Sequence, residues 1–509
     1  MLALVKSFTL NGITGYPVDV EVDINNGLPG YETVGLAETA VKESRERVRS
    51  GIKNSGYLFP ASRITVNLAP ADLKKLAPVF DLPISLGILA ATEQISYKCL
   101  ENIVFLGELS LDGRVRRING ILPILISAIK CGFSKFFVPR ENQAETVWIE
   151  NAEIVLVDSL VNAVNFLTGA EQYQKVVSKN IKDIIKNTGI GSDFKYIKGQ
   201  QRAKRALEIA AAGGHNMLMI GPPGAGKTML ARALPSILPD MTPEEALETS
   251  KIHSISGTLG SAGIVTTRPF RTPHHTATTV SLTGGGTYAR PGEISLAHNG
   301  VLFLDELPEY SRYTLETLRQ PLEDGVIVIN RANNTVEYPA RFVLIASMNP
   351  CPCGLYGSQD DECKCTPAQI QKYLNRLSGP MLDRIDMHIS VDSVKYDELT
   401  KESDEVCSSV IKERVNHARN IQSDRLKDCG IYCNAQMPQQ LLEKYCNMTP
   451  RAKEILKLSF TKLKLSARAY SRILKVARTI ADLDGLQQID EKQIAEAVSY
   501  RTLDRKLWR

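Results

Sequence analysis

The sequence has no uncharged apolar run that approaches about 18 residues, the length a helix needs to cross a bilayer. It also has no basic region ahead of its short apolar beginning, Met1 to Val5, so this end does not have the pattern of a secretion signal. We therefore expect no membrane segment and a chain that works in the cytoplasm.

An excess of either charge is also missing. The 61 Lys and Arg residues nearly balance the 56 Asp and Glu residues, which leaves a formal net charge of +5. Such a balance permits a polyanionic partner but does not predict one, because many enzymes are equally basic. With 43% hydrophobic and 23% charged residues, the composition is that of globular proteins, and 509 residues exceed one ordinary domain. We expect two or three domains.

Without a secretion signal, the ten cysteines are better explained as reduced thiols or metal ligands than as disulfides. Four of them form two close pairs, Cys351-Pro-Cys353 and Cys363-Lys-Cys365. Two such pairs can supply the tetrahedral sulfur ligands of a structural Zn²⁺. The C-x-C spacing is less specific than C-x-x-C, so free thiols, a disulfide and an iron–sulfur cluster remain alternatives.

The strongest motif is G-x-x-x-x-G-K-T, which follows the apolar run Met217 to Ile220 and precedes an apolar-rich helix. This strand–loop–helix order is the context of a phosphate-binding loop, in which backbone N–H groups surround phosphate at a helix N-terminus. The loop consists of Gly221, Pro222, Pro223, Gly224, Ala225, Gly226, Lys227 and Thr228. We expect Lys227 to contact the β- and γ-phosphates of ATP and Thr228 to bind Mg²⁺.

A second buried strand, Val301 to Leu304, ends in Asp305 and Glu306. Asp305 is expected to hold Mg²⁺, and Glu306 to orient and deprotonate the attacking water. A third apolar strand, Phe342 to Met348, ends in Asn349, which would hold that water or contact the γ-phosphate. The three strands together predict an ATP-hydrolysing site.

The first 168 residues predict an α+β domain, with alternating strands at residues 18–24 and 64–68 and a helix at 37–50. The stretch Phe105 to Gly132 resembles the corresponding part of Lon-type protease domains. The positions of the catalytic serine and lysine of those proteases carry Ile84 and, approximately, Ile124. Ser85 is one residue away but has no lysine as its base, so proteolysis has no mechanism. We expect a non-proteolytic scaffold for oligomer contacts or DNA.

Two further stretches, RPFRTPHHTATTVSLTGGG at residues 268–286 and LRQPLEDG at 318–325, resemble the magnesium-chelatase-like AAA+ ATPases. The resemblance runs nearly end to end with the competence-related ComM/YifB family. It implies an insertion in the second helix of the ATPase core, placed at residues 257–300, and a β-hairpin at 326–338. It also implies that Gly199 and Gln200 line the adenine pocket.

In that family, by analogy with related ring helicases, the insertion and the hairpin would face a central pore. Basic side chains there would contact DNA phosphates, which requires only positive charge and hydrogen-bond donors. The candidates are Arg268, Arg271, His274, His275 and Arg331. A structural role for the two histidines is the alternative, while metal binding by these two alone is disfavoured.

The resemblance also assigns two arginines to the ATP site. Arg384 would be the arginine finger that enters the neighbouring subunit's site, with Arg376 as the second choice. A local salt bridge of Arg384 with a neighbouring aspartate is the simpler alternative. Arg468 matches the sensor-2 arginine, just inside a helix that Ser466 would cap, and Arg472 is its alternate.

We thus expect an α/β and α+β multidomain protein with a Lon-like α+β domain (1–168), a linker (169–192), a phosphate-loop AAA+ core with a parallel sheet (193–395) and a C-terminal helical lid (396–509). The resemblance implies an ATP-driven ring, expected to be a homo-hexamer, that acts on branched or single-stranded DNA. The motor subunit of a metal chelatase and a protein-remodelling ATPase are the alternatives.

Overall fold

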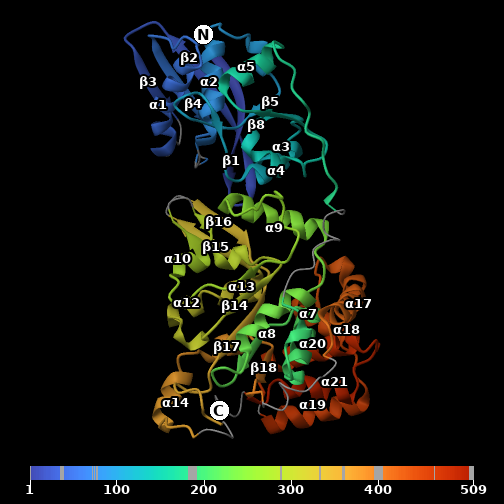
Figure 1. Cartoon of the computed structure of the whole chain (residues 1–509). Helices are drawn as coiled ribbons and strands as arrows, with labels where there is room; N and C mark the ends of the chain where they lie inside the picture. Colours follow the sequence, from blue (N-terminus) through green and yellow to red (C-terminus); the bar gives the residue numbers. More distant parts are fainter. Residues whose placement is uncertain are drawn as a thin grey trace.

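The computed structural model describes residues 2–34, 39–71, 73, 75, 78–181, 192–286, 289–331, 334–357, 362–394, 405–463 and 465–503. Figure 1 shows an N-terminal part of strands and helices, a middle part built around a second sheet, and C-terminal helices beside the middle part. Ten residues of the expected linker, 182–191, lie outside the described residues, as do 395–404 at the expected start of the lid.

The N-terminal part is built on a seven-stranded mixed sheet in the order β3-β4-β2-β1-β5-β8-β9. Its strands are β1 (Leu2–Asn11), β2 (Thr14–Asn25), β3 (Gly30–Val34), β4 (Arg63–Ala69), β5 (Ile103–Phe105), β8 (Lys135–Pro139) and β9 (Glu153–Val157), with a separate small pair, β6 (Glu108–Leu109) and β7 (Val115–Arg116). Within the seven-stranded sheet, β1–β2 and β2–β4 are antiparallel and the other pairs are parallel, while the separate pair β6–β7 is antiparallel. The alternation predicted two of these strands, because each buries only every second residue.

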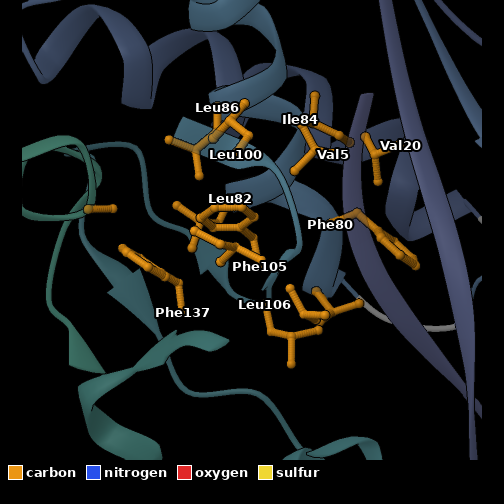
Figure 2. Packing of buried hydrophobic residues seen from close by; sticks show 14 of the residues in the cluster. Val5, Val20, Phe80, Leu82, Ile84, Leu86, Leu100, Phe105, Leu106 and Phe137 are labelled. Atoms are coloured by element: carbon orange, nitrogen blue, oxygen red, sulfur yellow. The ribbon is translucent and has the colours of Figure 1, made fainter. Parts of the chain in front are cut away.

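Helices α1 (Thr39–Asn54), α2 (Asp81–Ala91), α3 (Ile121–Lys130), α4 (Gln143–Thr146) and α5 (Leu160–Thr168) accompany this sheet. Helix α2 is buried along its whole length, and its apolar side chains pack with those of β1 and β5 (Figure 2). Ile84 and Ile124, which the resemblance to Lon-type domains would place at the catalytic positions, are 1% and 2% exposed and belong to this core. They contribute apolar packing and neither a nucleophile nor a base.

The middle part contains a five-stranded, all-parallel sheet in the order β11-β14-β17-β10-β18. The strands are β10 (Met217–Ile220), β11 (Phe270–Arg271), β14 (Val301–Leu304), β17 (Val343–Met348) and β18 (Met387–Ser390). Because helices and other elements cover both faces, β10 and β14 are buried at every residue, which explains their unbroken apolar runs. The parallel sheet of the expected fold class is therefore present.

Segments around this sheet include helices α7 (Gln201–Gly213), α8 (Lys227–Ala233) and α9 (Pro243–Ser256). The expected insertion contains short elements: β11, α10 (Thr279–Thr283), β12 (Gly284–Gly285), β13 (Arg290–Pro291) and α11 (Glu293–Leu296). Helices α12 (Arg312–Glu316) and α13 (Arg319–Asp324) follow β14. The predicted hairpin is present as β15 (Val326–Arg331) and β16 (Asn334–Pro339), and its turn residues 332–333 lie outside the described residues.

After α14 (Pro367–Leu374), α15 (Gly379–Leu382) and β18, the chain is helical. The helices are α17 (Ser408–Leu426), α18 (Gln439–Tyr445), α19 (Pro450–Leu463), α20 (Ala467–Leu483) and α21 (Glu491–Ser499). Ser466 caps α20 as predicted, since its side chain accepts a hydrogen bond from the N–H of Ala469. None of the described helices is long and apolar enough to cross a membrane.

Candidate ATP site

The phosphate loop connects the end of β10 to the start of α8, so its backbone N–H groups surround the N-terminus of that helix. Gly224 and Gly226 have φ angles of +78° and +84°, a conformation that residues with a Cβ rarely adopt. Gly221 has no room for a side chain, because a Cβ there would lie 2.0 Å from the carbonyl oxygen of Val391. The glycines of the motif are therefore required by the shape of the loop.

The ammonium group of Lys227 lies inside this loop. Its Nζ donates to the carbonyl oxygens of Gly221 (2.7 Å) and Pro222 (2.8 Å) and to Oδ1 of Asn349 (3.1 Å). Burial lowers the pKa of Lys227, while Asp305 and Glu306 act in the opposite direction. The structure thus brings the lysine of the loop and the asparagine at the end of β17 into direct contact, as expected for two groups that share one phosphate.

Asp305 follows β14 and is fixed by three donors. Its carboxylate accepts from the hydroxyl of Thr228 (2.8 Å), from the N–H of Glu306 (3.0 Å) and from the hydroxyl of Ser347. A hydroxyl and a carboxylate in contact are oxygen donors of the kind Mg²⁺ prefers, so Thr228 and Asp305 fit the predicted magnesium site. Ser347 was not predicted, although its polar side chain in the apolar strand β17 was the available signal.

Glu306 has a φ of +51°, which is uncommon for a residue other than glycine and marks a strained position at the site. Its carboxylate is 57% exposed and lies 3.6 Å from Nδ1 of His275. Exposure suits a base that must reach a water molecule. His275, expected to contact DNA, instead lies beside the acid that is expected to activate the water.

Gly199 and Gln200 adjoin the phosphate loop, although they precede it by more than twenty residues. The side-chain amide of Gln200 donates to the carbonyl oxygens of Ala225 (3.3 Å) and Asp392 (2.5 Å). The N–H of Gly199 donates to Glu405 (3.1 Å), which also accepts from Lys204. This placement agrees with a segment that borders the nucleotide, and the contact with Glu405 was not predictable from spacing.

Two of the three arginines expected to contact DNA, Arg268 and Arg271, are paired with carboxylates of the same chain. Arg268 is bound to Glu245 (2.8 Å) and donates to the carbonyl oxygens of Pro239 and Asn299. Arg271 forms a two-point ion pair with Glu293 (2.6 and 2.7 Å). Such pairs hold both side chains away from an incoming phosphate, so this geometry gives the DNA role of Arg268 and Arg271 no support.

The other candidates for DNA contact differ. His274 is exposed, stacks on His275 with ring centroids 4.1 Å apart, and its Nδ1 contacts the hydroxyl of Thr276 (2.8 Å). Tyr310 fixes the same segment, because its hydroxyl donates to the carbonyl oxygen of Pro273 (2.6 Å). Arg331 ends strand β15 at the tip of the hairpin, and its side chain lies outside the described residues.

The two arginines considered for a role between subunits differ in exposure. Arg384 is buried, with Nη2 2.6 Å from Glu323 and Nη1 donating to the carbonyl oxygen of Pro380. Arg376 is 50% exposed and pairs with Glu309 (2.7 Å), which lies just beyond the acids of the site. A residue that reaches a neighbouring subunit must be accessible, so the structure favours the second choice, Arg376, over Arg384 for that role.

For the sensor-2 position, Arg468 is exposed in the first turn of α20, whereas Arg472 one turn later pairs with the buried Asp386. Asp386 also accepts from the N–H of Asn216 (2.8 Å), directly before β10. Arg472 therefore joins the C-terminal helices to the middle sheet. Arg468 makes no comparable contact among those the described residues show.

The four cysteines of the predicted metal site converge. Their sulfur atoms all lie within 4.8 Å of one another, with 3.3 Å between Cys351 and Cys353, 3.7 Å between Cys351 and Cys363, and 3.6 Å between Cys353 and Cys363. A tetrahedral zinc site with Zn–S bonds of about 2.3 Å has sulfur–sulfur separations of about 3.8 Å. A disulfide would require about 2.05 Å. The observed spacing fits a tetrathiolate site and not a disulfide.

The phosphate loop, the paired acids after β14, the polar end of β17 and the parallel strand order together define a P-loop ATPase of the AAA+ class. Three family descriptions match successive parts of the chain: "Magnesium chelatase, subunit ChlI" at residues 193–399, "Subunit ChlI of Mg-chelatase" at 20–142, and "Magnesium chelatase, subunit ChlI C-terminal" at 405–501.

Among relatives, the competence protein ComM of Haemophilus influenzae is 44% identical over 508 residues, which is 99% of this chain and 98% of that protein. The YifB protein of Salmonella typhimurium is 45% identical, with the same coverage of both chains. The magnesium-chelatase 38 kDa subunit of Rhodobacter capsulatus is 27% identical over 31% of this chain and 50% of its own length. The chain belongs to the ComM/YifB family of magnesium-chelatase-like AAA+ ATPases, which implies ATP and Mg²⁺ as cofactors.

Proposed function

We propose that the protein is an ATP-driven motor that acts on branched or single-stranded DNA in the cytoplasm, assembled as a homo-hexameric ring. The end-to-end match to a relative named for competence is the observation that carries this proposal. The magnesium-chelatase 38 kDa subunit of Rhodobacter capsulatus aligns over only 31% of this chain, although family descriptions named for a magnesium-chelatase subunit match most of it. The difference in coverage between the two relatives favours DNA over a metal chelatase complex, which is the second candidate.

ATP hydrolysis follows from the contacts of the site. Lys227 and the loop N–H groups would bind the phosphates, while Thr228 and Asp305 would hold Mg²⁺. Glu306 would accept the proton of the attacking water, and Asn349 would orient that water or the phosphate. Arg376 is accessible at the surface next to these acids, so it could stabilise negative charge in a neighbouring site of the ring.

ATPase activity measured with and without a four-way DNA junction tests the DNA proposal. We expect the junction to stimulate hydrolysis and to bind at low salt with ATP present, with an affinity that falls steeply as salt increases. Sedimentation or electron microscopy with ATP should show a six-membered ring. Absence of binding to both junction and single-stranded DNA at low salt would overturn the proposal and favour a chelatase or protein-remodelling motor.

We further propose that the four cysteines bind one structural Zn²⁺. The sulfur separations support this proposal. The ligands support it as well, because thiolates are soft ligands of the kind that Zn²⁺ accepts. Elemental analysis of protein purified without chelators should find about one zinc per chain, the stoichiometry of a tetrathiolate site. A preparation with intact ATPase and no metal would show that the thiols are simply reduced.

A further inference from the structure

The cysteine cluster begins immediately after the catalytic end of β17. Asn349, whose side chain accepts from Lys227 at 3.1 Å, is separated from Cys351 by one proline. Cys351 is fully buried, and its sulfur accepts from the N–H of Tyr356 at 3.3 Å. The first thiol is therefore tied by two rigid peptide units to a group that contacts the lysine of the phosphate loop.

The turn from Cys351 to Gly354, which contains the first two cysteines, packs against the phosphate loop itself. Gly354 has a φ of +84°, and a Cβ added to it would lie 2.4 Å from Cδ and 2.8 Å from Cγ of Pro223. Its N–H donates to the carbonyl oxygen of Cys351 at 3.0 Å. Because a proline ring cannot move away as a flexible side chain can, the position of this turn limits the position of Pro223.

The second pair of cysteines leads directly into helix α14. Cys365 directly precedes Thr366, which caps helix α14 through a reciprocal box with Gln369. The four sulfurs thus join the end of β17, the turn against Pro223 and the start of α14. Without a cation at their centre, four sulfurs this close cannot all ionise, and neutral thiols are joined only by weak S–H hydrogen bonds, so the firmness of the junction depends on what the sulfurs bind.

We propose that the metal-bound cysteine turn is a positioning element for the phosphate loop: occupancy of the Cys351, Cys353, Cys363 and Cys365 site holds Gly354 against Pro223 and thereby sets the affinity for nucleotide. This inference rests on the zinc site proposed above and is independent of the DNA substrate. A loosened turn lets Pro223 and the loop N–H groups leave their phosphate-binding arrangement, so ATP binding weakens while the acids that activate water are untouched.

Two glycines of the same loop offer a matched comparison. Gly354→Ala forces a Cβ into Pro223, whereas Gly357→Ala, at a φ of +81°, places its Cβ where none of the described residues lies within 4 Å. Both carry the same backbone strain. We expect Gly354→Ala to raise the KM for ATP about tenfold with a much smaller change in kcat, the usual size for loss of a supporting contact, and Gly357→Ala to leave KM near that of the parent.

Metal removal supplies the second arm. Chelation of the full-length protein should raise the dissociation constant of a fluorescent ATP analogue by a similar factor, and added Zn²⁺ should restore it. Gly354→Ala should retain its zinc, and chelation should not raise its dissociation constant for the ATP analogue any further. Unchanged nucleotide affinity after confirmed zinc loss, or equal KM values for the two alanine variants, would overturn the inference. A protein that binds no DNA but shows these effects would refute only the DNA function.

Discussion

At the scale of single residues, the polar side chains of the candidate ATP site form two hydrogen-bonded pairs, Lys227 with Asn349 and Thr228 with Asp305. Lys227, Thr228, Asp305 and Asn349 are joined by hydrogen bonds because the carboxyl ends of parallel strands meet at one edge of the sheet. Residues that are far apart in the sequence and meet only in the folded chain have no sequence pattern of this kind. The ion pair of Arg271 with Glu293 is an example, since a basic residue in an insertion has the same pattern whether it faces a partner or an internal carboxylate.

Two substitutions at this scale separate binding from chemistry. We expect Lys227→Ala to weaken ATP binding by roughly 100-fold, because it removes a charged donor to phosphate. Glu306→Gln should bind ATP as the parent does but hydrolyse it about 10² to 10⁴ times more slowly, the usual contribution of a positioned base. Titration with a fluorescent ATP analogue and a steady-state phosphate assay measure the two effects. Parent-like turnover by Glu306→Gln would remove Glu306 from its assigned role.

At the scale of elements, local patterns predicted what local physics determines. The cap of α20 by Ser466 is present, since it depends on neighbouring residues, and so is the hairpin β15–β16 that the family resemblance implies. The junction between elements depends on packing instead. Arg472 on α20 meets Asp386 before β18, a pair that joins helices and sheet across 86 positions of sequence.

Asp386 offers a test of that junction. Although burial raises its pKa, Arg472 and then His215 hold the pKa of Asp386 well below its usual range, and burial lowers the pKa of His215. Asp386→Asn leaves the arginine partly buried without a counter-charge, which should cost about 3 kcal/mol locally. We expect faster hydrogen exchange in β18 and α20, measured by mass spectrometry, with Asp383→Asn as the control for the lost charge.

The pH dependence of this junction has a defined sign. A carboxylate whose pKa is lowered in the folded state stabilises that state fully at pH values above its ordinary pKa of about 4. This stabilisation is lost as pH falls below that value. A histidine with a lowered folded pKa adds destabilisation as pH falls below about 6.5, because the opened state binds the proton more readily. Protection of α20 should therefore decrease on acidification, and below about pH 4, where the Asp386 carboxylate itself contributes, it should decrease less in Asp386→Asn. Equal acid sensitivity in both proteins would contradict this assignment.

At the scale of the whole molecule, the N-terminal part rests on the two elements that the family resemblance assigns to the pore. The β1–β2 turn meets the hairpin, where a Cβ on Gly12 would lie 3.1 Å from Val336 and Glu337, and Ile13 packs on the same apolar cluster (Figure 1). The insertion is met by Trp148, whose Nε1 donates to the carbonyl oxygen of Ala262 (2.9 Å), and helix α4 meets α9 directly before the insertion, since Ser254 donates to the buried Glu145 at 2.5 Å. Movement of the hairpin or the insertion would therefore be transmitted to the N-terminal part.

One added methyl group should open the contact between the insertion and helix α4. A Cβ on Gly263 would lie 1.8 Å from the carbonyl oxygen of Ala144, beside the hydrogen bond from Trp148 Nε1 to Ala262 (2.9 Å). We expect Gly263→Ala to raise hydrogen exchange in α4 and at the C-terminal end of α9 about tenfold, and to change the ratio of DNA-stimulated to basal ATPase activity while ATP binding persists. The readouts are exchange mass spectrometry and the phosphate assay with and without a junction.

Gly286→Ala is the control for that substitution, because it lies in the same insertion at a φ of +75° but its Cβ would meet none of the described residues within 4 Å. The two variants share the strain of a left-handed backbone and differ only in the contact with α4. Slow exchange in α4 of Gly263→Ala, equal to that of Gly286→Ala, would mean that this contact does not hold the N-terminal part in place. If exchange rises but the stimulation ratio is unchanged, the N-terminal part is attached to the insertion without influencing the motor.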